Sequence, residues 1–316
     1  MNRDFETTFT KTINAKINEL CSNEPTIIFG QNIISGSRVS GLGTGLEKNI
    51  DSLAINTTNT ENSLIGMGFG ILLTGVNAIY LMKQHDFGLL GFDQLRHTNN
   101  LLRNLQIAKN FRIIQVVVDS GMEGPQSNLN NLNEYSSISD APVYFLNSLE
   151  NIEFAFEKSK KDQLSVLAIS QSTMKSPVSQ ISEKSVETGI GRLYFSASNH
   201  ERKILLIAFA TNSNFATQVR SHLEDLEFEL DILLVSHLEK YQLEDSQIWS
   251  RYQTIIVSDE SKSVVSFSDL LLQELYRLYP EKKIIPLRNQ RNKSWATVDE
   301  DTPGWELESI VNLIGK

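Results

Sequence analysis

The chain has 316 residues, of which 40% are hydrophobic and 21% charged, and a formal net charge of −9 at pH 7. This length supports two domains, each with its own hydrophobic core. The acidic balance argues against a nucleic-acid-binding surface, which needs clustered Lys and Arg. The single cysteine, Cys21, excludes an intramolecular disulfide and a cysteine-based zinc site.

No targeting or membrane segment is predicted. The opening sequence MNRDFETTFTKTINAKINEL is polar and mixed in charge, unlike a secretory signal. The longest apolar stretch, Leu64–Met82, contains several glycines and changes its hydrophobic period halfway along. A helix followed by a strand explains this stretch better than a membrane span does. We therefore expect a cytoplasmic protein.

The first half of the chain alternates short apolar runs with amphipathic segments of helical length, which is the pattern of an α/β sheet. Strands are predicted near Thr26–Phe29, Ser52–Ile55, Val76–Leu81, Arg112–Val118, Val143–Phe145 and Leu164–Ala168. Helices are predicted near Ile13–Cys21, Glu61–Leu73, Phe92–Leu105 and Leu149–Lys158.

From Ser170 to about Arg202 the sequence is polar, which predicts a connection between domains. A second α/β unit follows, with predicted strands Lys203–Phe209, Leu230–Val235, Thr254–Val257 and Lys283–Pro286, and predicted helices Asn214–Asp225, Ser263–Tyr279 and Trp305–Ile314. We therefore expect an α/β fold of two open, mostly parallel sheets. The predicted limits are a first domain over 1–175, a linker over 176–202 and a second domain over 203–316.

The most informative segment runs from Asn56 to Asn104. Glu61 is predicted in the first turn of its helix, where a carboxylate complements the positive end of the helix dipole. That structural role alone would explain the residue. The same helix carries glycines within GMGFG, which lower helix stability and therefore suggest a close neighbour rather than a dinucleotide fingerprint. The earlier SGSRVSGLGTG lacks the Lys-Ser/Thr ending of a phosphate loop and is interpreted as a mobile loop.

His85-Asp86-Phe87 follows the strand AIYLM and is followed in turn by GFDQ. These residues lie where a strand ends and a helix begins, and ligands of open α/β sheets bind at the carboxyl ends of the strands. Together with Glu61, this order resembles the pyrimidine-binding domain of the thiamine diphosphate-dependent transketolase superfamily. VVVDSGMEGPQS (116–127) resembles the corresponding transketolase strand and loop, and the second unit resembles the C-terminal domain of the family.

The resemblance assigns functions to individual residues. It implies that Glu61 hydrogen-bonds a ring nitrogen of the aminopyrimidine and promotes proton transfer within the cofactor. Phe87 corresponds to the aromatic residue that stacks on this ring, although an ordinary core role would also explain it. Asn59 and Asp86 are assigned to cofactor binding. No intrinsic metal site is predicted in this chain.

The family's diphosphate-binding domain carries a Gly-Asp-Gly signature, which is absent from this sequence. The resemblance therefore implies a partner subunit that carries this domain and holds most of the Mg2+ and the diphosphate. It also implies an α2β2 assembly in which two copies of this chain pair as a beta–beta homodimer. The chain alone is then expected to be inactive, and the substrate is a small molecule.

One departure concerns the active-site histidine that family members carry in the loop after Gly-Pro. Here the loop reads Pro125-Gln126-Ser127-Asn128 and contains no histidine. His85 is the candidate catalytic replacement, while His97 and Gln126 are candidate substrate contacts; a plain polar role would also explain each of them.

The leading hypothesis is a split transketolase-like carboligase that forms or transfers an acyl-anion equivalent on a 2-oxoacid or sugar. One alternative is the beta subunit of the decarboxylating component of a 2-oxoacid dehydrogenase complex. Another is a non-catalytic scaffold that retains the fold.

Overall fold

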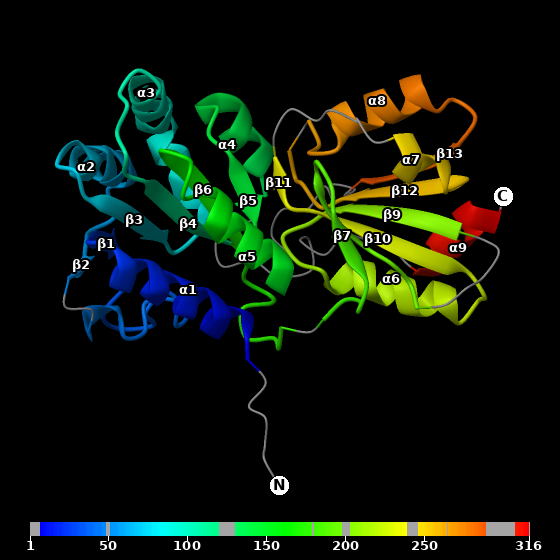
Figure 1. Cartoon of the computed structure of the whole chain (residues 1–316), viewed down its shortest axis with the longest axis horizontal. Coiled ribbons are helices and arrows are strands. Elements are labelled where there is room, and N and C mark those ends of the chain that lie inside the picture. The colour runs from blue at the N-terminus through cyan, green and yellow to red at the C-terminus, as the bar shows by residue number, and fades with distance from the viewer. Residues whose placement is uncertain are drawn as a thin grey trace, which may run out of the picture.

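The computed structural model describes residues 7–48, 51–119, 130–178, 180–197, 203–238, 246–263, 265–288 and 307–315. The chain forms two sheets, each covered by helices on both faces (Figure 1). This arrangement confirms the α/β class with two open, mostly parallel sheets. It follows from the near-continuous apolar runs of the central strands, which are typical of strands buried on both faces.

The first sheet has seven strands in the order β11-β5-β6-β4-β3-β1-β2, and all neighbours pair in parallel except β11. Its strands are β1 (Thr26–Gly30), β2 (Leu53–Asn56), β3 (Asn77–Met82), β4 (Phe111–Val117), β5 (Val143–Phe145), β6 (Leu164–Ser170) and β11 (His237–Leu238). The helical elements of this half are α1 (Phe9–Asn23), η1 (Leu46–Lys48), α2 (Glu61–Leu73), η2 (His85–Gly91), α3 (Phe92–Leu102), α4 (Leu132–Ser139) and α5 (Leu149–Lys158).

The second sheet has six strands in the order β13-β12-β9-β10-β8-β7. Its strands are β7 (Ser185–Glu187), β8 (Gly191–Tyr194), β9 (Lys203–Phe209), β10 (Glu229–Val235), β12 (Thr254–Asp259) and β13 (Lys283–Arg288). Its helices are α6 (Asn214–Glu224), α7 (Ser246–Ser250), α8 (Asp269–Leu278) and α9 (Leu307–Gly315). The pairs of β7 with β8 and of β8 with β10 are antiparallel, and the others are parallel.

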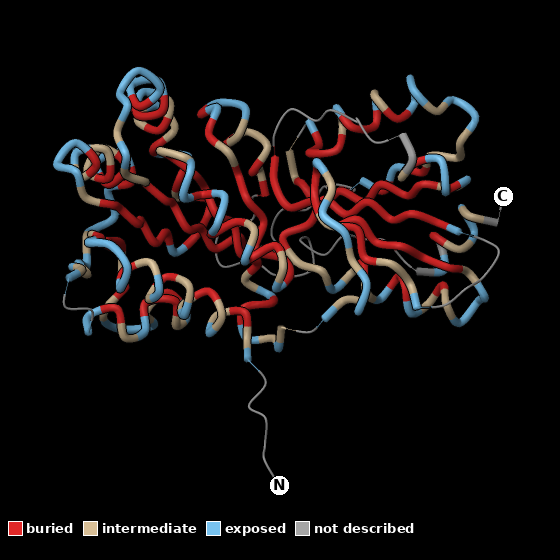
Figure 2. The backbone as a smooth tube through the Cα atoms, in the orientation of Figure 1, coloured by how far each residue is buried: buried red, intermediate tan, exposed pale blue. Residues whose placement is uncertain are grey.

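Among the described residues, the buried apolar side chains form three clusters. The buried backbone follows the strands of both sheets (Figure 2). One lies between the first sheet and α1 and α5, and another lies between the second sheet and α6 and α9. The third and largest runs under α2, α3 and α4 and continues into the second domain beneath α8, with Phe145 and Phe267 in contact across the junction at 5.9 Å between ring centroids. The two domains therefore share one core.

The glycine-rich segment after β1 packs against the protein, in contrast to the mobile loop that its composition suggests. Ile33, Val39 and Leu42 are buried, and the Asn14 side chain donates to the carbonyl oxygens of Leu42 and Thr44. Apolar residues at regular positions among the glycines anchor the segment to α1.

The segment predicted as a linker over 176–202 contributes two strands to the second sheet. β7 and β8 form an antiparallel hairpin, and β8 pairs with β10. Ile190, Leu193 and Tyr194 are buried, and these few apolar side chains suffice to dock the hairpin onto an edge of the sheet. The sequence prediction was wrong here because the strands are short and their apolar residues are widely spaced.

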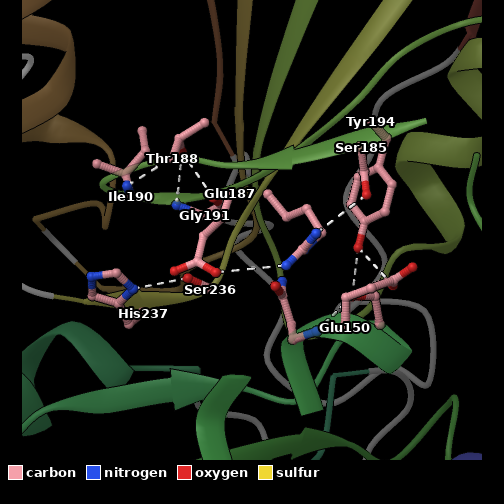
Figure 3. A network of polar contacts seen from close by, with 12 residues as sticks. Glu150, Ser185, Glu187, Thr188, Ile190, Gly191, Tyr194, Ser236 and His237 are labelled. Carbon is pink, nitrogen blue, oxygen red and sulfur yellow. Dashed lines mark hydrogen bonds and ion pairs between the residues drawn. The ribbon is translucent and has the colours of Figure 1, made fainter. Parts of the chain in front are cut away.

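β11 crosses between the domains. It follows β10 of the second sheet but pairs antiparallel with β5 of the first. Near it, the Tyr194 hydroxyl group donates to Glu150 of α5 (2.9 Å) and contacts the Ser148 hydroxyl group (2.8 Å), so the hairpin is tied to the first domain (Figure 3). Apolar contacts and hydrogen bonds thus both hold the domain junction together.

Arg220 of α6 joins three parts of the second domain. Its guanidinium group donates to the carbonyl oxygens of Leu230 (3.0 Å), Ile181 (3.0 Å) and Tyr194 (2.7 Å). Burial lowers the pKa of Arg220, and no carboxylate forms an ion pair with it in the described part of the chain. Three backbone carbonyl groups therefore depend on this one side chain.

We expect Arg220→Met to lower the free energy of unfolding by about 3 kcal/mol, because it leaves these carbonyl groups without their donor. Urea unfolding measures the change. Arg277→Met is the matched control: Arg277 is exposed on α8 and pairs only with Glu274, so its loss is expected to cost less than about 0.5 kcal/mol. Equal effects of the two substitutions would contradict this role for Arg220.

His237 makes the junction sensitive to acid. Its ring stacks near Phe154 at 5.6 Å, and its Nδ1 lies 2.8 Å from the Ser236 hydroxyl group (Figure 3). Burial, and then the charge of Lys158, lower the pKa of His237 from 6.5 to about 4. The unfolded chain therefore takes up a proton at a higher pH than the folded chain does, and stability is lost as the pH falls from 6.5 towards 4.

In the wild type, the free energy of unfolding is expected to fall between pH 7 and pH 4. We expect this fall to be about 2–3 kcal/mol smaller in His237→Asn, as measured by urea unfolding at both pH values. His97→Asn is the control, because the His97 side chain is 65% exposed. The prediction fails if both variants keep the wild-type dependence on pH.

Candidate active site

Two connections meet at the carboxyl edge of the first sheet. β1 lies between β2 and β3, and all three strands are parallel. α2 follows β2, and η2 follows β3, so the starts of both elements lie at the same edge of the sheet. The end of η2 touches the first turn of α2: a Cβ on Gly91 would lie 2.3 Å from Ile65 Cδ1 and 3.5 Å from the Glu61 carbonyl oxygen.

Glu61 is the first residue of α2 and is only 5% exposed. Within the described part of the chain, no side chain or backbone N–H group donates a hydrogen bond to its carboxylate. A buried carboxylate is costly unless a partner compensates its charge. The helix dipole supplies part of this compensation, and the rest is available to a ligand with a hydrogen-bond donor.

Two buried tyrosines interact electrostatically with Glu61. Burial, and to a lesser degree the Glu61 charge, raise the pKa of Tyr80 well above its usual range. Burial also raises the pKa of Tyr135, and the charges of Asp86 and Glu61 add to this effect. Both phenols are therefore neutral and add no charge near the carboxylate.

Asp86 and Phe87 both lie on η2, but their exposure differs. Asp86 is 4% exposed, whereas Phe87 is partly exposed and packs against the shared core. The structure thus brings Glu61, Asp86 and Phe87 together at one edge of the sheet. These are three of the residues that the sequence resemblance assigns to the cofactor.

His85 is the first residue of η2, and its side chain is fully buried. Its Nδ1 lies 2.7 Å from Gln115 Oε1 on β4, and its Nε2 lies 3.4 Å from the Asn131 backbone nitrogen. His85 Nε2 also lies 2.5 Å from Asn131 Oδ1. Burial lowers the pKa of His85 and favours the neutral ring, which donates from only one of its two nitrogens. This geometry favours a positioning role for His85 over direct contact with a substrate.

Tyr135 and Gly88 were not among the predicted site residues. The Tyr135 hydroxyl group donates to the His85 carbonyl oxygen (2.8 Å), and its ring contacts the rings of His85 and Phe92. A Cβ on Gly88 would lie 1.4 Å from the Tyr135 hydroxyl oxygen. The glycine after Asp86-Phe87 is the sequence signal for this close approach; nothing in the sequence points to Tyr135.

Two of the remaining predicted residues are exposed. Asn59 is exposed in the connection before α2. His97 is exposed on α3, 3.6 Å from Asp93 one turn earlier. Gln126 lies outside the described residues. Of the glycines in α2, Gly68 confirms the expected close neighbour, since a Cβ there would lie 2.2 Å from the Phe111 ring, whereas Gly70 has nothing within 4 Å.

No protein-family model matches the sequence, and a search of the curated proteins gives no match. Solved structures do match. A structure described as "Split gene transketolase, inactive beta4 tetramer" superposes with a TM-score of 0.67 at 11% identity, covering 97% of this chain and 95% of that one. The transketolase of Campylobacter jejuni subsp. jejuni NCTC 11168 superposes with a TM-score of 0.67 at 13% identity.

The chain shares its fold with these two transketolase structures. It aligns over 96% of its own length with 45% of the Campylobacter jejuni transketolase chain, and thus spans less than half of that protein. Among the described helices, none is both long enough and apolar enough to cross a membrane.

We expect Gly88→Ala to lower the free energy of unfolding by about 2–4 kcal/mol, because the methyl group displaces Tyr135 from the His85 carbonyl oxygen. Urea unfolding measures the change. The matched control, Gly70→Ala, places its methyl group in open space within a helix and is expected to raise stability by about 0.5–1 kcal/mol. Stability losses of the same size in both variants would contradict the steric argument.

Proposed function

We propose that this chain is the beta-type subunit of a split, thiamine diphosphate-dependent transketolase-like enzyme. The buried Glu61 carboxylate, which lacks a donor among the described residues, is the observation that carries the proposal. The reaction class is cleavage and ligation of C–C bonds on a 2-oxoacid or sugar, and thiamine diphosphate, when bound, supplies the acyl-anion chemistry.

The residues at the carboxyl edge of the first sheet fit the aminopyrimidine end of this cofactor. Glu61 would hold a proton at a ring nitrogen of the bound aminopyrimidine through a charge-assisted hydrogen bond. Phe87 offers an apolar ring against the face of the pyrimidine, and Asp86 supplies a second acceptor at this edge. Asn59 belongs to the same connection as Glu61 and is a polar contact of the cofactor or of the partner. His85 orients η2 and thus Phe87.

A partner subunit with a Gly-Asp-Gly domain completes the proposed site and holds the Mg2+ and the diphosphate. Full-length overlap with a split-gene transketolase chain, and partial overlap with a complete transketolase, support this division of the enzyme. The name of the split-gene structure describes a tetramer of beta chains as inactive. We propose the same dependence on a partner here.

We also propose that two copies of this chain pair through the first domain within an α2β2 heterotetramer. α2 carries no charged residue after Glu61, and its Leu73 is 56% exposed. On the neighbouring elements, Leu90 is 69% and Leu101 is 49% exposed. A helix that is apolar around its circumference is typical of a buried position, which a second subunit would provide.

We expect Glu61→Gln to lower the activity of the reconstituted enzyme by about 100-fold or more, because the amide cannot hold the proton in the same way. Calorimetric titration of thiamine diphosphate with Mg2+ is expected to show weaker binding to the mixture of both subunits. A fully active variant, or no binding by the wild-type mixture, would contradict the proposal.

The stability of the Glu61→Gln chain alone separates this role from simple helix capping. We expect no loss in urea unfolding, because the substitution removes a buried charge. Glu308 is exposed in the first turn of α9, so Glu308→Gln is the matched control for the effect of the helix dipole. A capping role for Glu61 predicts a loss of about 0.3–1 kcal/mol in both variants.

A further inference from the structure

Two carboxyl groups meet where the strand ends of the two sheets face each other. Asp119 follows β4 of the first sheet, and Glu260 follows β12 of the second. Each carboxyl group is hydrogen-bonded to the connection between β9 and α6, Asp119 at Asn212 and Glu260 at Thr211. The two carboxyl groups are therefore held by consecutive residues of one connection.

The Asp119 carboxyl group accepts four hydrogen bonds from the described residues. It accepts hydrogen bonds from the hydroxyl groups of Ser170 and Ser172 (3.0 Å from Ser172), from the Ser172 backbone nitrogen (3.1 Å) and from Asn212 Nδ2 (2.8 Å). The first three donors belong to its own domain, and the fourth crosses the junction. These donors compensate the charge of an ionised Asp119.

Glu260 has fewer donors than Asp119. Its Oε1 accepts from the Thr211 backbone N–H, and Asn130 Nδ2 of the first domain lies 3.4 Å away. The Lys262 backbone nitrogen donates to the Asn130 carbonyl oxygen (2.9 Å) and reinforces the same crossing point. Glu260 thus contacts both domains through side-chain hydrogen bonds.

We propose that Asp119 and Glu260 form a proton-dependent latch between the two domains. The latch is closed while Glu260 carries a proton beside ionised Asp119, and it loosens when both carboxyl groups are ionised. Ionisation of Glu260 then places two negative charges at one crossing point, and their mutual repulsion opposes the closed junction that the bonds from Asn130 to Glu260 and from Asn212 to Asp119 hold together.

The surrounding charges act in the same direction. Burial, followed by the charge of Asp119 and, more weakly, of Asp259, raises the pKa of Glu260 from 4.5 to about 8. Asp259 precedes Glu260 on β12 and is itself held by the backbone nitrogens of Ser261 and Ser268. The folded chain therefore keeps a proton that the unfolded chain releases above pH 4.5. Stability from this group is present at low pH and is lost as the pH rises to about 8.

The test compares thermal unfolding of the full chain and its Glu260→Gln variant between pH 6.5 and pH 8.5, where the acid-dependent effect of His237 is complete. The wild-type midpoint is expected to fall by roughly 5 °C across this range, and the variant midpoint is expected to stay nearly constant. Glu308→Gln changes an exposed side chain of α9, serves as the control and is expected to follow the wild type. Identical profiles for wild type and Glu260→Gln would overturn the proposal.

Two further readouts separate a latch from a local stability effect. In Asp119→Asn, the midpoint of thermal unfolding is expected to reach its low, high-pH value at a lower pH than in the wild type. The reason is that the Asp119 charge, which opposes ionisation of Glu260, is gone. Hydrogen exchange, corrected for the intrinsic effect of pH, is expected to accelerate at Thr211 and Asn212 between pH 6.5 and pH 8.5 in the wild type but not in Glu260→Gln. An unchanged end point in Asp119→Asn, or exchange that accelerates only away from the junction, would overturn the latch.

Discussion

The apolar core that passes from α2, α3 and α4 into the second domain is the feature on which the rest of this structure depends. Because parallel strands end at the same edge of a sheet, packing both sheets on one core determines which strand ends face which neighbours. The ends of β2 and β3 place Glu61 and η2 side by side, while the ends of β4 and β12 bring Asp119 and Glu260 to the domain junction.

The carboxyl groups of Glu61 and Glu260 differ in how their burial is compensated. Glu61 lies at a helix N-terminus, and the proposed function assigns its missing donor to a bound cofactor. Glu260 has one backbone donor at Thr211 and a longer contact from Asn130, and burial together with the charge of Asp119 raises its pKa. In both cases the free energy of a buried carboxyl group connects local structure to a larger event, either cofactor binding with a second subunit or the contact between domains.

Contacts between the core and η2 determine the position of this short helix. The neutral His85 ring contacts Gln115 and Asn131, and the Tyr135 hydroxyl group holds the His85 carbonyl oxygen. None of these groups needs to touch a substrate to matter, because they determine the position of the next residues along the chain. The arrangement therefore separates the residues that position Phe87 from those that face the edge of the sheet.

Hydrophobic periodicity in the sequence determined the α/β class, most long strands and the helix that begins at Glu61, because these patterns are local. The order of Glu61, Asp86 and Phe87 along the chain also indicated one candidate site. Only the tertiary structure decided that His85 is buried, that Tyr135 supports it, and that the predicted linker adds β7 and β8 to a sheet. Each of these depends on contacts between distant segments, such as the pairing of β8 with β10, and short edge strands and buried polar partners leave little local pattern in a sequence.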